Sequence, residues 1–456
     1  MKKNDKEQIE QERQQEETRQ SREELLLEKR EVRRRRRMRN QVVAYTAVVA
    51  LIAAFAVGIV IGVRELMAAG KANTESQKQQ DVVQGLLGQE ETLEEPEPTE
   101  VIAEMTQDQK LDEIVNAVIE VMPLEDKVAG LFVVTPENIT GVGTAVQAGE
   151  GTKQALSQYR VGGIVYFAKN MKSKEQLAEM IANTTLYSSY PLFIAVDEEG
   201  GSVSRVAGAG IAEGVDSAQK IAETGNTDNA YQAGITVGGY LSDLGFNLDF
   251  APVADIANVE GNTLKDRSYG ADAATVAPYV TAMLEGLEER DVSACLKHFP
   301  GIGSSTGDTH DGMATTDRTL EEFRAEEFTV FQAGIDAGVD MIMVSHIAAP
   351  ALTGDNTPCS LSSAVVTDLL RNELDFEGVI ITDALNMSAI TDYHEADEAA
   401  VLALRAGCDM ILMPDDFEKA YKGVLQAVQD GTISEERIND SLRRIYRIKY
   451  AGKVEE

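Results

Sequence analysis

Residues 293–301 read SACLKHFPG and show the pattern that decides the fold. The stretch starts as a continuous apolar run and ends in a lysine and a histidine, followed by a Pro-Gly turn. A strand that is apolar without alternation is typical of a parallel sheet that is buried on both faces. Ionisable residues directly after such a strand lie at its C-terminal end, where barrels of alternating strands and helices collect their functional groups.

The same pattern recurs along the chain from about residue 107. Amphipathic stretches of helical length separate the apolar runs, as at 174–185, 276–289 and 320–337. We therefore predict an α/β fold, a (β/α)8 TIM-like barrel, for residues 107–456. Its expected strands are 129–134, 163–167, 192–196, 246–251, 293–296, 341–344, 379–381 and 410–413.

The first hundred residues have a different composition. Residues 42–63 carry no charge and are long enough for a transmembrane helix, and arginines 33–37 precede them. This indicates a cytoplasmic tail at 1–41, a membrane anchor at 42–63, an acidic extracytoplasmic linker at 64–106 and an extracellular catalytic domain. A signal peptide that is cleaved near residues 67–70 is the alternative.

Composition excludes several classes of function. With 42 Lys+Arg against 76 Asp+Glu, the net charge of −34 disfavours nucleic acid as a partner. The three cysteines have no CxxC spacing, so we expect buried thiols, with no disulfide framework and no zinc site. No dinucleotide-binding or phosphate-binding glycine motif is present, and no organic cofactor is expected. The cysteines are Cys295, Cys359 and Cys408.

Ionisable side chains follow four of the expected strands. The segments are 197–201 (DEEGG), 297–301 (KHFPG), 345–346 (SH) and 382–386 (TDALN). Three of the four histidines, His298, His310 and His346, lie at or just after these strand ends. Because the C-terminal ends of barrel strands surround one mouth, we expect these groups to share a site.

These segments resemble glycoside hydrolase family 3, in particular its single-domain β-N-acetylglucosaminidases. The resemblance extends over about residues 107–452. It is carried by KHFPG at 297–301 with Asp308-x-His310 after it, by ITDALNM at 381–387, by DEEGG at 197–201 and by DRSYG at 266–270. In this order the motifs are highly specific.

The resemblance implies a retaining hydrolase with a role for each matching residue. Asp383 would attack the anomeric carbon, and His310, oriented by Asp308, would act as acid and then as base. An imidazole titrates near neutral pH, so it can give and later take a proton. The residues implied in substrate binding are Asp197, Arg205, Arg267, Lys297 and His298.

Each assignment has a structural alternative. Asp383 could cap the helix that follows it, and His310 could be a surface loop residue. The acid could instead be a carboxylic acid such as Glu198 or Glu199. His346 could contact a ligand or hold a loop at the mouth. A metal site formed by Asp308, His310 and His298 is a further alternative, and His394 is expected to be exposed.

Two departures from the family pattern affect specificity. Ile302 stands where a histidine is usual, and Ser202 stands where an arginine is frequent. Neither change removes a proposed catalytic residue. The leading hypothesis is an exo-acting β-N-acetylglucosaminidase for amino-sugar oligosaccharides or muropeptides derived from the cell wall. A β-glucosidase or β-xylosidase, and a non-catalytic wall-binding module, are the alternatives.

Overall fold

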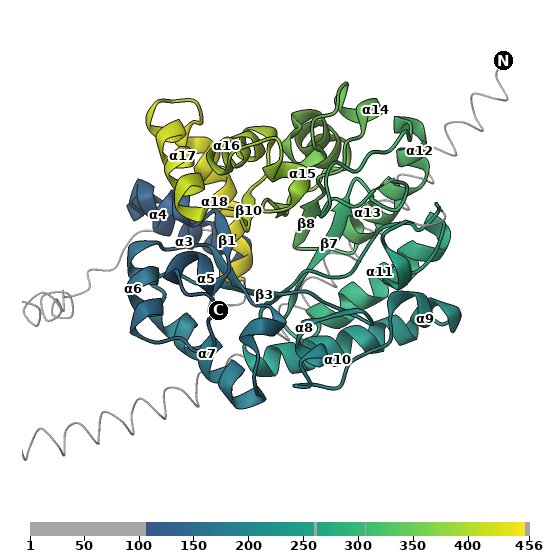
Figure 1. Cartoon of the computed structure of the whole chain (residues 1–456), viewed down its shortest axis with the longest axis horizontal. Coiled ribbons are helices and arrows are strands. Elements are labelled where there is room, and N and C mark those ends of the chain that lie inside the picture. Colours follow the sequence, from purple (N-terminus) through teal and green to yellow (C-terminus); the bar gives the residue numbers. More distant parts are fainter. Residues whose placement is uncertain (1–105, 260–261, 306, 452–456) are drawn as a thin grey trace, which may run out of the picture.

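Eight parallel strands close into a barrel in the order in which they occur in the chain (Figure 1). The computed structural model describes residues 106–259, 262–305 and 307–451, and the barrel lies within them. The last strand pairs again with the first, through Phe132 and Ile411. The predicted TIM-like barrel is confirmed. The barrel strands are β1 (Phe132–Val134), β2 (Gly163–Val165), β3 (Phe193–Val196), β6 (Leu248–Asp249), β7 (Ser293–Phe299), β8 (Met341–Val344), β9 (Val379–Ala384) and β10 (Met410–Leu412).

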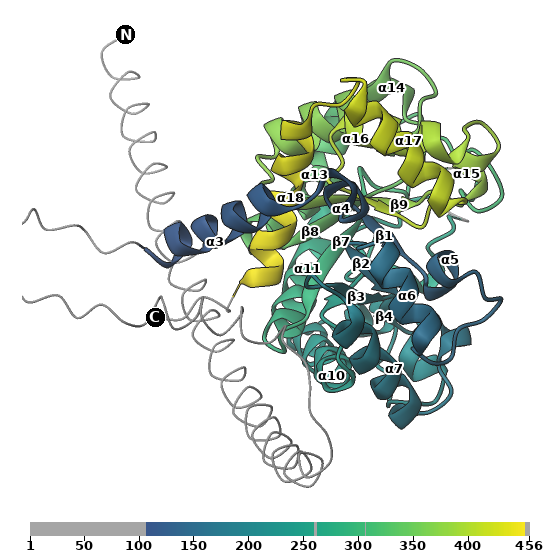
Figure 2. The same ribbon diagram turned by 90° about the vertical axis from the view of Figure 1, so that its left-hand side faces the viewer.

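Helices and short turns connect these strands and surround the barrel (Figures 1 and 2). A small hairpin, β4 (Glu198–Gly200) with β5 (Val203–Ser204), follows β3. The helices are α3 (Gln107–Val121), α4 (Leu124–Ala129), α5 (Pro136–Thr140), α6 (Glu150–Gln158), α7 (Lys174–Tyr187), α8 (Arg205–Gly208), α9 (Ala218–Glu223), α10 (Asp228–Leu244), α11 (Ala273–Glu288), α12 (Leu320–Ala325), α13 (Glu327–Asp336), α14 (Pro350–Thr353), α15 (Ser388–Thr391), α16 (Ala396–Ala406), α17 (Phe417–Gln429) and α18 (Glu435–Tyr450). Single turns η1 (Ala168–Asn170), η2 (Lys265–Arg267) and η3 (Cys359–Leu361) and the π-helix η4 (Ala364–Glu373) complete the described elements.

Side-chain caps fix where several helices begin. Ser173 accepts a hydrogen bond from the backbone N–H of Gln176 at the start of α7, and Asp272 does the same for α11. Thr319 and Glu322 form a reciprocal capping box at the start of α12. Such caps satisfy N–H groups that have no partner within the helix, so the boundaries are encoded locally.

Each of the eight predicted strands overlaps a barrel strand. Two barrel strands are longer than predicted, β8 matches its predicted bounds, and the other five are shorter. β7 continues through Lys297 and His298, and β9 continues through Asp383. The strands were predicted from runs of apolar residues, and such a run stops at the first polar residue. The predicted strand therefore ends before the polar residues that continue it. The extra length places these three side chains on the strands themselves.

The predicted helix at 320–337 is wrong in one respect. The structure divides it into α12 and α13 at Glu326, whose backbone has φ −119° and ψ −83°. The apolar spacing continues across the break, so periodicity alone does not reveal it. Because of the break, Glu327 is the first residue of α13, and its side chain is fully buried.

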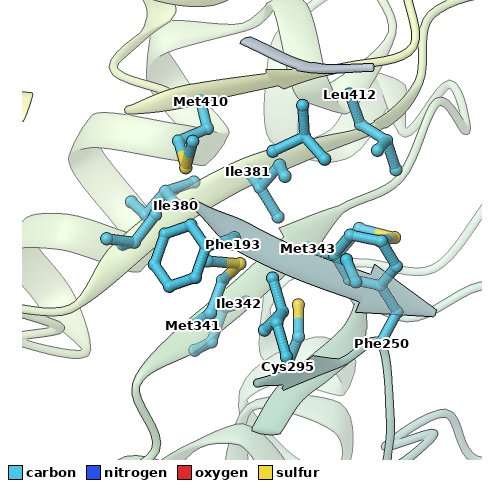
Figure 3. Close-up of a cluster of buried hydrophobic side chains, with 14 of the residues drawn as sticks. Phe193, Phe250, Cys295, Met341, Ile342, Met343, Ile380, Ile381, Met410 and Leu412 are labelled. Carbon is cyan, nitrogen blue, oxygen red and sulfur yellow. The ribbon is translucent and has the colours of Figure 1, made fainter. Parts of the chain in front are cut away.

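The barrel core is apolar and closely packed. Phe193 on β3, Cys295 on β7, Met341 on β8 and Ile381 on β9 lie together in it (Figure 3). All three cysteines are buried free thiols, as predicted. Aromatic and branched side chains of this size bury much apolar surface, which is the main source of stability in such a core. This packing fixes the strand ends on which the site stands.

The predicted anchor at 42–63 and its flanking segments lie outside the described residues. In the part of the chain that the structure describes, no helix is both long and apolar enough to cross a membrane. Figure 2 shows α3 and α18 on one side of the barrel and α5 and α15 on the opposite side.

Candidate active site

A chain of alternating charges connects three segments at the barrel mouth. Lys297 Nζ lies 2.7 Å from Asp197 Oδ1 and 2.6 Å from Glu199 Oε1. Arg267 on η2 in turn donates two hydrogen bonds to Glu199, at 2.7 and 2.8 Å. The predicted binding residues Asp197, Lys297 and Arg267 are thus brought together, with Glu199 between the two cations.

The charges in this chain stabilise one another. Burial opposes the ionisation of Glu199, but Lys297 and Arg267 outweigh it and lower the pKa of Glu199 to about 2. Burial also opposes the charge on Lys297, yet Asp197 and Glu199 hold the Lys297 pKa above its usual value. At neutral pH, Glu199 is therefore a carboxylate, which cannot serve as a proton donor.

The other carboxyl in the segment, Glu198, points into a different environment. Its side chain is fully buried and accepts hydrogen bonds from the backbone N–H groups of Val206 and Ala207 and from the Tyr240 hydroxyl. These contacts hold the start of α8, where Arg205 lies. Burial raises the pKa of Glu198, while three donors engage its two oxygens.

His298 is held by a residue that the sequence analysis missed. Its Nδ1 lies 2.7 Å from Asp255 Oδ2, and the other oxygen of Asp255 accepts the backbone N–H of Ile302 at 2.8 Å. Asp255 is fully buried just after β6. The polar residue that ends the run APVAD at 251–255 was the available signal, but nothing in the sequence pairs it with His298.

Asp383 lies on β9 and is poised as an anion. Its Oδ1 accepts a hydrogen bond from the N–H of Ala384 at 2.8 Å. Burial disfavours its charge, but His298, His346, this N–H and Lys297 together hold the pKa of Asp383 below its ordinary value. An ionised carboxylate at the end of a barrel strand is the state that a nucleophile requires.

His346 holds the backbone beside Asp383. Its Nε2 lies 3.0 Å from the carbonyl oxygen of Ala384, and its Nδ1 lies 2.7 Å from the Ser360 hydroxyl. Burial lowers the pKa of His346, which favours the neutral ring, although the Asp383 charge acts in the opposite direction. A neutral ring that donates from Nε2 to the carbonyl must accept from Ser360 at Nδ1. Of the two predicted readings for His346, the structure favours a histidine that holds the loop.

The Asp308 and His310 side chains form a pair on the loop after β7. His310 Nδ1 lies 2.8 Å from Asp308 Oδ1, which also accepts the His310 backbone N–H at 3.0 Å. Burial opposes ionisation of Asp308, but these two contacts outweigh it and lower its pKa. The His310 side chain is 72% exposed. Asp308 occupies Nδ1, so Nε2 is the nitrogen available for proton transfer.

A backbone contact joins this loop to the segment of the nucleophile. The N–H of Ala389, on α15, donates to the carbonyl oxygen of Thr309 at 3.1 Å. Since α15 begins shortly after Asp383 on β9, the contact connects the two predicted catalytic segments. Thr309 lies between Asp308 and His310, so the contact is made at the pair itself.

Arg205 lines a hollow of about 350 Å³ that is formed by segments following β1, β2 and β10. Its guanidinium lies 5.8 Å from the centre of the Phe167 ring. Its Nε is buried and has no hydrogen-bond partner among the described residues. A buried donor without a partner is costly, which makes it a candidate contact for a polar ligand. The other residues of the hollow are Thr135, Ala168, Lys169 and Met413.

The glycosyl hydrolase family 3 N-terminal domain model matches residues 123–448, which include every one of these site residues. The chain belongs to glycoside hydrolase family 3. This confirms the predicted family and the prediction of a glycosidase.

Two relatives and one solved structure are each about a third identical to this chain over the aligned residues. A protein named beta-hexosaminidase from Nitrosomonas eutropha is 34% identical over 280 residues, which cover 59% of this chain and 78% of that protein. Beta-hexosaminidase LpqI of Mycobacterium tuberculosis is 33% identical over 339 residues, which cover 71% and 82%. The structure of a family 3 β-N-acetylglucosaminidase from Paenibacillus sp. superposes with a TM-score of 0.69 and 34% identity, covering 73% of this chain and 63% of that one.

The residues at the two departures from the family pattern make local hydrogen bonds. Ile302 uses its backbone N–H to reach Asp255. Ser202 donates to Asp266 Oδ1 at 2.7 Å and is exposed. The site of this family 3 chain therefore has neither a histidine side chain at position 302 nor an arginine side chain at position 202.

The metal alternative finds no support in the geometry. His298 is paired with Asp255, whereas His310 is paired with Asp308. No group of three or more possible metal ligands occurs within residues 106–451, apart from the few that are not described.

His394, which is predicted to be exposed, is only partly exposed and lies 3.3 Å from Glu398. A wider groove of about 790 Å³ between α16 and α17 contains none of the predicted site residues.

Proposed function

We propose that this chain is a retaining exo-β-N-acetylhexosaminidase that removes terminal β-linked N-acetylglucosamine from cell-wall-derived glycans. The proposal rests on the presence of two different kinds of group at the barrel mouth: an ionised carboxylate and a histidine paired with an aspartate. Asp383 is held ionised on a strand, while the Asp308–His310 pair lies on a loop that contacts the segment after it. Retaining hydrolysis needs one group of each kind.

In the first step, an Asp383 oxygen attacks the anomeric carbon and forms a glycosyl ester as the bond to the leaving oxygen breaks. His310 gives its Nε2 proton to that oxygen, so the aglycone leaves as a neutral alcohol. In the second step, a water molecule attacks the same carbon and His310 takes its proton. The ester bond breaks, and the Asp383 carboxylate returns with the sugar released in its original configuration.

The residues around Asp383 suit the binding of a sugar. Asp197 can accept hydrogen bonds from hydroxyls, and Lys297 and Arg267 can donate to sugar oxygens while Glu199 holds them in place. Arg205 offers a donor in the adjoining hollow. The preference for an N-acetylated sugar is supported by the relatives, which are named beta-hexosaminidases.

The substrate is tested with a panel of aryl β-glycosides: the N-acetylglucosaminide, the glucoside and the xyloside. Purified full-length chain should turn over the first of these fastest, and Asp383→Asn should be inactive on all three. A hundredfold preference for the glucoside or xyloside would overturn the sugar assignment. Binding of glycan without turnover of any substrate would mean a non-catalytic wall-binding module.

The site is further proposed to work outside the cell. Arginines 33–37 precede the uncharged stretch 42–63, which supports a single-pass membrane protein with a cytoplasmic N-terminus. The linker at 64–106 would then hold the catalytic domain away from the membrane. A cell-wall glycan fragment is the substrate that this location favours.

A further inference from the structure

Glu327 lies beneath both ends of the loop that carries His310. We call this loop, residues 300–305 and 307–319 between β7 and α12, the dyad loop. At its start, Gly301 packs so closely on Glu327 that a Cβ there would lie 2.5 Å from Glu327 Cγ. At its end, Arg318 Nη2 lies 3.2 Å from Glu327 Oε2. One fully buried side chain thus touches both arms.

The carboxyl of Glu327 lacks the donors that a buried carboxylate needs. Neither oxygen accepts a hydrogen bond from another described residue, because Arg318 approaches without hydrogen-bond geometry and the remaining nearby donor is the backbone N–H of Glu327 itself. A buried anion without donors is costly, whereas the neutral acid costs much less. Burial accordingly raises the pKa of Glu327 to about 7, even though Arg318 acts in the opposite direction.

Three charged groups face Glu327. Arg318, from the end of the dyad loop, favours its ionisation, whereas Asp255, from the segment after β6, and Glu326, from the same end of α13, oppose it. Asp255 differs from Glu327 because His298 and the N–H of Ile302 engage its two oxygens. Of these two carboxyls at the base of the loop, Glu327 is the one without donors.

The two arms of the dyad loop are also connected above the base. The hydroxyls of Ser304 and Thr316 lie 3.1 Å apart and connect the two arms, and the Thr316 N–H donates to Ala348. Beyond this connection, the exposed tip carries Asp308 and His310.

We propose that Glu327 is a positioning residue for the Asp308–His310 pair: its neutral carboxyl holds the two ends of the dyad loop together, and its ionisation loosens the loop. The direction follows from linkage. A proton stabilises the state that binds it more tightly. In the held state Glu327 is shielded from water, so its carboxyl binds a proton more tightly there than in the open state. The inference rests on the proposed function for the role of the pair, but loop motion can be measured without turnover.

Hydrogen exchange tests the proposal on the full-length chain. Peptides that cover residues 307–312 are followed by mass spectrometry at about pH 6 and pH 8, after correction for the intrinsic exchange rate. Opening should increase by up to about tenfold between these pH values, if Glu327 becomes fully hydrated on opening. Glu327→Gln is nearly isosteric and cannot ionise, so it should remove this dependence and keep the loop held.

Two matched variants separate Glu327 from other groups. Arg318→Gln removes the charge that favours ionisation of Glu327, so the loop should loosen at a higher pH than in the wild type. This variant also serves as the test if Glu327→Gln does not fold. His310→Ala removes the imidazole at the tip of the dyad loop, and should leave the pH dependence in place. The proposal would be overturned by any of three results. The corrected exchange rate of the wild type could be the same at both pH values, the pH dependence could persist in Glu327→Gln, or the pH dependence could be lost in His310→Ala.

A kinetic readout distinguishes positioning from general damage. Glu327→Gln should raise kcat at about pH 8 for glycosides with poor leaving groups and change activated aryl glycosides little. An equal loss for both substrate classes would contradict the positioning role. If no glycoside is turned over at all, the proposed function fails, while the exchange experiment still decides the role of Glu327.

Discussion

His346 Nε2 lies 3.0 Å from the carbonyl oxygen of Ala384, the residue that follows Asp383. The contact fixes the backbone whose N–H donates to the Asp383 side chain. Replacing His346 with Ala should therefore lower kcat and leave KM nearly unchanged. A displacement of about 1 Å at a reacting group can cost on the order of 100-fold in rate.

Steady-state kinetics on the aryl N-acetylglucosaminide check this prediction. Ser360→Ala is the matched control, because it removes the partner of the other ring nitrogen and leaves the Ala384 contact intact. Ser360→Ala should also lower kcat, but by less than His346→Ala does. A change confined to KM would instead mean that His346 contacts the substrate.

Glu199→Gln should make stability less dependent on pH. The lowered pKa of Glu199, about 2 in the fold, contributes stability that is present above its ordinary value of 4.5 and is lost as the pH falls through about 2. The contribution is roughly 3 kcal/mol at neutral pH, at 1.4 kcal/mol for each unit of pKa. Denaturant unfolding of both proteins between about pH 7 and pH 2 should show a difference that shrinks toward acid. A constant difference would refute this account of the charge chain.

His310→Ala should slow glycosides with poor leaving groups far more than activated aryl glycosides. Activated aglycones need little protonation, so their first step survives, and slow hydrolysis of the intermediate then gives a burst of product. Asp308→Ala should act in the same direction but more mildly, because the imidazole remains. Equal losses across the substrate series without a burst would indicate damage to binding or folding.

The proposed membrane topology predicts a simple protection pattern. Protease added to intact cells should remove the domain beyond residue 65 and spare an epitope placed within residues 1–30. Permeabilised cells provide the control, since both parts are then accessible. A protected catalytic domain would reverse the orientation that arginines 33–37 predict.

The barrel was predictable because its signal is local. Each strand contains or adjoins a short apolar run, and the residues after it share one end of the barrel. The break at Glu326 was not predictable, because the apolar spacing runs through it. Predicted strands also ended before Lys297 and Asp383, whose polarity conceals the last residues of β7 and β9.

The site was predictable where a motif carries it. Asp308 and His310 are two residues apart, and the predicted contact between them is present. Asp255 and Glu327 were missed because their importance comes from neighbours that are distant in sequence, His298 and Gly301. Glu199 was considered only as an acid, and its position between Lys297 and Arg267 gives it a different task.

The central claim is that Asp383 forms a covalent bond to the sugar. Full-length chain is incubated with an activated 5-fluoro N-acetylglucosaminyl probe, which slows hydrolysis of the intermediate, and is then digested and analysed by mass spectrometry. The account predicts one added fluoro-sugar on the peptide that contains Asp383 and none in Asp383→Asn. Labelling of a different carboxylate, or rapid turnover by Asp383→Asn, would contradict it.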